Sequence, residues 1–180
     1  MKTKKLVINI SLSGMFLAMA YVMPFLTGQI PEIGKMLCPM HIPVLLCGFI
    51  CGSPYGFVVG AIAPVLRSLT LSMPPILTAV TMAVELAVYG FMAGLLYNSL
   101  PKKKINIYVS LICAMVVGRI SEGIASFFVY RMGFDVKPFS LEVFWTGTVV
   151  NAIPGIIVQI VLIPIVVMLL EKSKLFSIKK

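Results

Sequence analysis

The chain has 180 residues, of which 59% are hydrophobic and 12% are charged, and its mean hydropathy is +1.04. Soluble domains are about half apolar and a quarter charged, so this composition excludes a soluble enzyme or binding domain and predicts an all-α integral membrane protein. The net charge of +9 would suggest a nucleic-acid partner in a soluble chain, but the lysines gather at the ends of apolar runs, which indicates retention of those ends in the cytoplasm.

Six apolar runs follow one another and predict a compact six-transmembrane-helix bundle that forms a single membrane domain over residues 1–180. The predicted spans are 6–23, 41–51, 54–69, 76–97, 105–130 and 142–170. Ten of the 15 basic residues lie in the N-terminal tip, in the loop after the fourth span and in the C-terminal tail: Lys2, Lys4, Lys5, Lys102, Lys103, Lys104, Lys172, Lys174, Lys179 and Lys180. This asymmetry predicts that both termini are cytoplasmic.

The first run, 6–23, has two features of its own. Ala18-Met19-Ala20 resembles a signal-peptide cleavage site, but the run continues to Pro24, and an uncleaved span keeps both lysine-rich ends on one side, so we favour retention. Gly14 and Ala18 form a small-xxx-small pair, which provides a smooth face for another helix. That helix could belong to a partner protein or to the bundle itself.

The loop 27–39 and the hairpin after it form the next unit. Gly28, Gly34 and Lys35 lack the spacing, and the following Ser or Thr, of a phosphate-binding loop. Two apolar runs then flank a tight break at residues 51–54. A hairpin that is apolar on every side belongs in lipid, and we interpret it as a packed element of the bundle and not as a single anchor. Its small residues recur near fourfold spacing, which favours close helix packing: Gly48, Gly52, Gly56, Gly60, Ala61 and Ala63.

Ionisable and amide side chains interrupt three later spans at a similar depth. Glu85, Arg119, Glu122 and Asn151 fall about 13 to 18 Å from the outer helix ends at a rise of about 1.5 Å per residue. An ionised side chain at mid-bilayer costs several kcal/mol unless it is paired or hydrated. The residues therefore predict either an ion-pair cluster that fixes the helix register or a polar pocket that opens outward. A proton relay through the two glutamates is a further interpretation.

In the pocket interpretation, each polar residue has a role. Arg119 or Arg67 would anchor an anion or a carbonyl group. Glu85, Glu122 and Asn151 would form hydrogen bonds with the ligand.

Three aromatic or imidazole side chains complete the predicted site. Tyr89 and Trp145 would form apolar or stacking walls, although Trp145, close to the start of its span, also suits an interfacial anchor. His41 is the only histidine, and at a loop-to-helix junction it is predicted to cap the helix or to contact a ligand.

The sequence gives little support for a metal site or a catalytic site. Cys47 and Cys51 lie one helical turn apart and could bind a metal, but small buried hydrophobic residues are the better interpretation. Zinc sites need several His, Cys or carboxylate ligands, and neither such a set nor a Gly-x-Ser-x-Gly elbow is present. We therefore predict no metal, no cofactor and no enzymatic activity.

Residues 38–56, CPMHIPVLLCGFICGSPYG, resemble the second-to-third span region of the S components, the substrate-binding subunits, of energy-coupling factor (ECF) vitamin transporters. The six-span length, the small face of the first span, and Pro154-Gly155 with Gln159 in the last span are similar to that family as well. The resemblance implies a six-helix protein in the cell membrane that binds a water-soluble vitamin or related nutrient near the outer surface, under the loop between the first two spans.

The resemblance also implies partners. An S component docks through its first helices onto a shared membrane coupling subunit, which two ATP-binding-cassette ATPases drive. Gly14 and Ala18 would take part in docking, although the family pattern has alanine at both positions. The chain itself has no ATP-binding loop, which fits a subunit powered by others.

The substrate and two other function classes remain open. The sequence is most similar to the pantothenate-type branch, and Arg119 or Arg67 would suit a carboxylate; riboflavin, B6-type vitamins, folate and queuosine precursors are alternatives. A stand-alone ion- or proton-coupled carrier should contain repeated halves, and no convincing repeat is present. An intramembrane enzyme would need a nucleophile or metal set that these residues do not supply.

Overall fold

The computed structural model describes residues 2–27, 30, 34, 36–101, 103–132 and 150–172. Its helices are α1 (Lys2–Val22), the 3-10 helix η1 (Met23–Thr27), α3 (His41–Cys51), α4 (Ser53–Leu71), α5 (Ile76–Ser99), α6 (Lys104–Arg131) and α8 (Ile153–Lys172). The described residues contain helices and no strands, which confirms the all-α prediction. Asn151 and Ala152 form a turn ahead of α8, and residues 142–149 of the predicted sixth span lie outside the described part.

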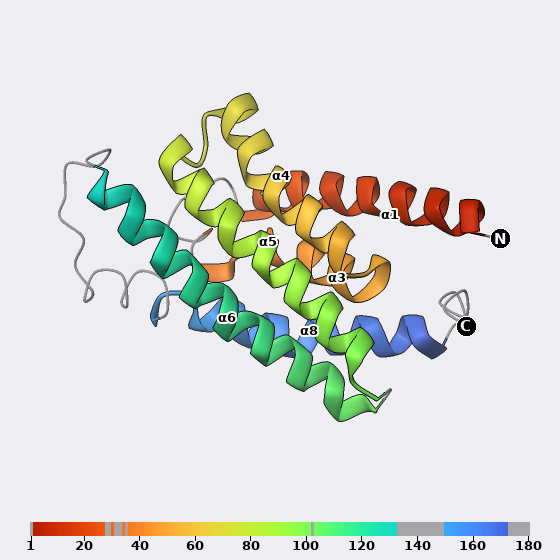
Figure 1. Cartoon of the computed structure of the whole chain (residues 1–180). Helices are drawn as coiled ribbons and strands as arrows, with labels where there is room; N and C mark the ends of the chain where they lie inside the picture. Colours follow the sequence, from red (N-terminus) through yellow and green to blue (C-terminus); the bar gives the residue numbers. More distant parts are fainter. Residues whose placement is uncertain are drawn as a thin grey trace.

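The helices pack so that the basic ends meet. In Figure 1 the start of α1, the end of α8 and the connection between α5 and α6 lie at one end of the bundle. The connection between α4 and α5 and the end of α6 lie at the other end. The first end carries Lys4, Lys5, Lys103, Lys104 and Lys172. This clustering is what the positive-inside rule requires, and the assignment of that end to the cytoplasm stays a prediction.

Helix α3 lies at the centre of the bundle, and all of its residues are buried. Helices α1, α4, α5 and α8 pack around it. At a rise of about 1.5 Å per residue it is only about 16 Å long, whereas the hydrocarbon core is about 30 Å thick. The interpretation of this half of the hairpin as a packed bundle element agrees with the structure, because α3 is enclosed by protein.

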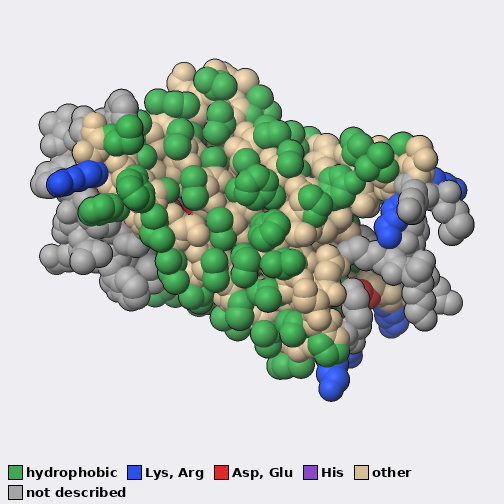
Figure 2. Space-filling model, in the orientation of Figure 1, with side chains coloured by type: hydrophobic (Ala, Val, Ile, Leu, Met, Phe, Trp, Pro, Cys, Tyr) green, Lys and Arg blue, Asp and Glu red, His purple; other side chains and the backbone are tan. Residues whose placement is uncertain are grey.

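Among the described residues, five helices are long and apolar enough to cross a membrane: α1 together with η1, α4, α5, α6 and α8. Hydrophobic side chains cover the middle of the face shown in Figure 2, while the visible Lys and Arg side chains lie toward its two ends. Exposed apolar residues on separate helices, such as Phe57, Ile105 and Ile157, would be costly in water. A bundle with this surface is stable in lipid.

Glycines let α3, α4 and α5 touch backbone to backbone. Gly52, between α3 and α4, has φ of 105°, a conformation that favours glycine. A Cβ atom on Gly90 would lie 2.3 Å from the carbonyl oxygen of Gly56, and one on Gly60 would lie 2.3 Å from that of Leu86. The small residues of the hairpin therefore pack mainly against α5, which sets the rotation of α5 about its axis.

We expect Gly90→Ala to destabilise the bundle by about 1–3 kcal/mol, because the added methyl group forces α4 and α5 apart. Gly14→Ala is the matched control, since a Cβ atom at Gly14 meets nothing within 4 Å. Unfolding of both variants in one detergent measures the difference. Equal stability would contradict a tight seam between α4 and α5.

Candidate functional site

Glu85 is the centre of a charged cluster where α3, α5 and α6 meet. Its side chain is 2% exposed, and its Oε1 atom lies 2.9 Å from Nη1 of Arg119 on α6. Its Oε2 atom lies 3.4 Å from Nε2 of His41, the first residue of α3. Helices α3 and α6 thus place an imidazole and a guanidinium group beside one carboxylate of α5.

Arg119 also binds a second carboxylate. Its Nη1 atom lies 3.2 Å from Oε2 of Glu122, one turn further along α6. The side chains of Arg119 and Glu122 are 15% and 14% exposed, so they lie closer to the surface of the cluster than Glu85. From the helix bounds, Glu85 and Glu122 lie about 13 Å from the nearer ends of α5 and α6.

Tyr89 lies one helical turn after Glu85 on α5 and contacts the same group of side chains. Its ring packs edge-on against His41 with centroids 5.2 Å apart. A Cβ atom on Gly118 would lie 3.0 Å from the Tyr89 ring, so the glycine makes room for it. We call His41, Glu85, Tyr89, Arg119 and Glu122 the Glu85 cluster.

Two residues that the predicted site did not include also meet the cluster. Cys38 places its Sγ atom 3.8 Å from Nη2 of Arg119, and its carbonyl oxygen is 3.5 Å from Nε2 of Gln159 on α8. Gln159 is 2% exposed and is a polar residue in an apolar run, the same signal that identified Glu85. Nothing in the sequence marks Cys38, because a buried cysteine in an apolar run normally serves packing.

Two buried nitrogen atoms of the cluster have neither a hydrogen-bond partner nor an ion pair within the described residues. They are Nδ1 of His41 and Nε of Arg119. Buried polar atoms are usually paired with protein groups or water. These atoms are therefore available to a water molecule or a ligand.

Arg67 lies apart from the Glu85 cluster, near the C-terminal end of α4. Its Nη1 atom donates a hydrogen bond of 2.9 Å to the carbonyl oxygen of Tyr21 at the end of α1. Its guanidinium group also lies 5.0 Å from the centre of the Phe25 ring, a cation–π contact. Arg67 is 4% exposed, and these contacts tie α4 to the end of α1 and to η1.

The remaining predicted residues are spread more widely. Asn151 is exposed in the turn before α8, and Trp145 lies outside the described residues. Gly14 and Ala18 are both exposed on α1. The described residues that the structure brings together are those from the second, fourth and fifth predicted spans.

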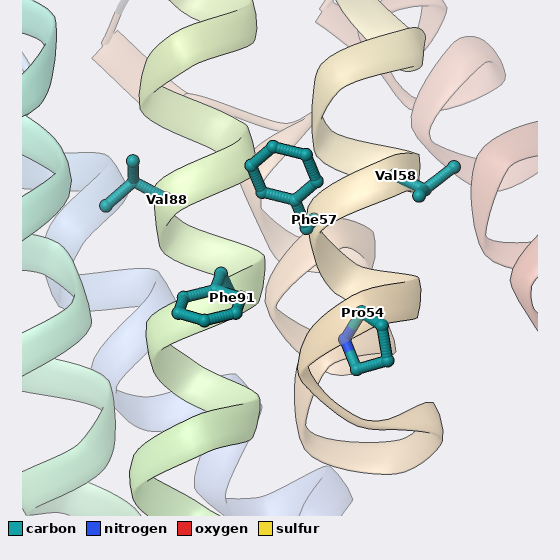
Figure 3. A pocket seen from close by; sticks show the side chains of 5 residues that line it. All are labelled: Pro54, Phe57, Val58, Val88 and Phe91. Atoms are coloured by element: carbon teal, nitrogen blue, oxygen red, sulfur yellow. The ribbon is translucent and has the colours of Figure 1, made fainter.

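Two surface hollows occur elsewhere. The first, of about 400 Å³, lies between α4 and α5 and is lined only by apolar side chains, Pro54, Phe57, Val58, Val88 and Phe91 (Figure 3). The second, of about 490 Å³, lies between the start of α6 and the end of α8, beside Lys104, Ile165, Met168, Leu169, Glu171 and Lys172. The Glu85 cluster lines neither hollow, so the outward-opening pocket stays a prediction.

Residues 8–167 match the family model described as "ECF transporter, substrate-specific component". The matched segment includes every residue of the Glu85 cluster as well as Gly14 and Ala18. No curated protein and no solved structure matches the chain significantly.

Proposed function

The chain belongs to the substrate-specific components of ECF transporters, and from that premise we propose that the Glu85 cluster binds a water-soluble vitamin or related nutrient for import. A protein of this family is a substrate-binding subunit of an importer and not an enzyme. It is a multi-pass protein of the cell membrane and works with an ECF module made of a membrane subunit and ATPases.

The observation that carries the proposal is the arrangement around Arg119. Ionised groups within a membrane bundle are costly, and they commonly mark a substrate or ion pathway. Here His41, Glu85 and Arg119 come from three helices, and two of their buried nitrogen atoms have no partner within the described residues. An ion-pair cluster that only fixed helix register would gain stability from satisfying those atoms. The unpaired atoms favour a ligand.

The backbone beside the cluster supports the same conclusion. Cys38 has φ of 46°, a left-handed conformation that is uncommon for residues other than glycine. Such conformations cost of order 1–3 kcal/mol and concentrate at ligand-binding sites. Cys38 lies between Leu37 and the turn that precedes α3, and its sulfur contacts Arg119, so a nutrient at Arg119 would lie beside this strained position.

The exposed face of α1 is our candidate for docking to the coupling subunit of the module. Gly14 and Ala18 are exposed there, and a Cβ atom on Gly14 would meet nothing within 4 Å in this chain. Small residues let a second helix approach closely in lipid. Packing of this pair within the bundle, the alternative interpretation, has no support from the contacts of Gly14.

The identity of the nutrient is a separate question. Pantothenate is the substrate predicted from the sequence and stays a prediction, with riboflavin, B6-type vitamins, folate and queuosine precursors as alternatives. The proposed site would open toward the side of the membrane opposite the lysine-rich end.

We expect the purified chain to bind one nutrient tightly but to accumulate it in proteoliposomes only when the membrane coupling subunit, the two ATPases and ATP are added. The physical reason is that the chain holds the binding groups and the module supplies the energy. Mass spectrometry of the small molecule that co-purifies with the chain identifies the nutrient, and uptake of its labelled form measures transport. Concentrative uptake by the chain alone would instead establish a stand-alone carrier.

A further inference from the structure

Resting on the proposed function, we propose that the Glu85 cluster selects a nutrient that carries a positively charged nitrogen over one that carries a carboxylate. Three features of the cluster support this preference: its charged groups, the contacts that already occupy Arg119, and the position of Glu122.

The cluster holds two carboxylates and one guanidinium group. Glu85 and Glu122 supply the carboxylates, and Arg119 is the arginine that both contact. The nearby side chains of Tyr89 and Cys38 carry no formal charge. Arg67 is bound to the Tyr21 carbonyl and the Phe25 ring instead. A bound anion would therefore meet a second carboxylate that no further arginine balances, whereas a cation would pair with it.

Arg119 is also poorly placed to receive a carboxylate from a ligand. Arginine binds carboxylates best through two parallel N–H donors. In this structure Nη1 is shared between Glu85 and Glu122, at 2.9 and 3.2 Å, and Nη2 faces the Cys38 sulfur at 3.8 Å. Only Nε lacks a partner, and it is buried. A ligand carboxylate would have to displace one of the two glutamates and leave that glutamate unpaired in the bundle.

Glu122 is the group that a cationic nitrogen can reach. Its carboxylate is 14% exposed, compared with 2% for Glu85, and Arg119 approaches only through its Oε2 atom at 3.2 Å. It lies closer to the outer end of α6 than Arg119 does. An ammonium group there would form a charge-assisted hydrogen bond, which is stronger in a site with little water than at an open surface. Glu85 would hold Arg119 in place below it.

The first test is the charge of the small molecule released when the purified chain is denatured. We expect a molecule with a positively charged nitrogen and no carboxylate, identified by mass spectrometry; any other released nutrient overturns the inference. If the chain is purified empty, titration with pyridoxamine as the cationic probe and pantothenate as the anionic probe decides. We expect pyridoxamine to bind at least about 10-fold more tightly. Equal affinity or the reverse order overturns the inference.

Two glutamate variants test whether Glu122 is the residue that binds the cationic ligand. Glu122→Gln keeps the shape of the side chain and should weaken binding of the cationic ligand by about 10-fold or more. Glu171→Gln is the matched control, because Glu171 accepts a hydrogen bond from Tyr97 at the far end of α8 and should leave affinity unchanged. Unchanged affinity in Glu122→Gln overturns its role. If that variant does not fold, the two probes on the natural chain still decide between cation and anion.

These outcomes separate the inference from the proposed function. Tight binding of pantothenate or another carboxylate nutrient would overturn the charge preference and leave the chain a nutrient-binding subunit. An empty chain that binds neither probe, nor any nutrient of the proposed classes, would remove both.

Discussion

Replacing Arg119 by alanine is expected to lower the free energy of unfolding by about 3–5 kcal/mol and to weaken nutrient binding, because Glu85 and Glu122 would no longer be held in place. Without the guanidinium group, Glu85 loses its 2.9 Å partner and Glu122 its 3.2 Å partner, and Glu85 is almost fully buried. Unfolding of the detergent-solubilised chain measures the stability. Titration with the co-purified nutrient, at a temperature where the variant is folded, measures binding.

A second substitution separates the effect of Arg119 on stability from its effect on nutrient binding. Adding Glu85→Gln to Arg119→Ala removes one of the unpaired charges, so part of the lost stability should return while nutrient binding stays weak. If binding recovered together with stability, the Glu85 cluster would serve only to fix the helix register.

Arg67→Ala is the matched arginine control. It removes the same side chain from a position where the contacts are the Tyr21 carbonyl and the Phe25 ring, so it should reduce stability and leave affinity within about twofold. Loss of binding in Arg67→Ala with retention in Arg119→Ala would place the nutrient near the end of α1 instead.

Replacing Gly14 by leucine is expected to abolish assembly with the ECF module, and with it uptake, while nutrient binding by the isolated chain is unchanged. The leucine side chain finds open space in the isolated chain, because nothing lies within 4 Å of the Cβ position. It would project into any helix that packs closely on the pair of small residues. Co-elution of the chain with the module measures assembly, and labelled nutrient measures uptake in proteoliposomes.

Met15→Leu is the control for this experiment, since Met15 is exposed next to Gly14 and the exchange preserves volume. That variant should assemble normally. Normal assembly of Gly14→Leu would rule out docking through this face, and a loss of stability without the module would indicate packing within the bundle.

Several features could be predicted because they depend on local pattern. The helical limits of residues 41–51 were predicted and agree with those of α3, since proline and glycine chemistry bounds the run at both ends, although α3 alone is too short to cross the hydrocarbon core as the predicted span would. Glu85, Arg119 and Glu122 could be singled out because ionised groups in apolar helices are rare. The resemblance of residues 38–56 indicated the family that the match over residues 8–167 establishes.

Other features depend on how the helices rotate against one another, which uniformly apolar helices do not encode in their periodicity. The sequence by itself determined a helical membrane protein of the ECF family with charged residues at one depth. The tertiary structure decided that α3 is enclosed by protein, that Arg67 binds the end of α1, and that Arg119 holds two carboxylates. The reason is that backbone contacts at Gly56, Gly60 and Gly90 set the faces that α4 and α5 present to each other, and such contacts join residues far apart in the chain.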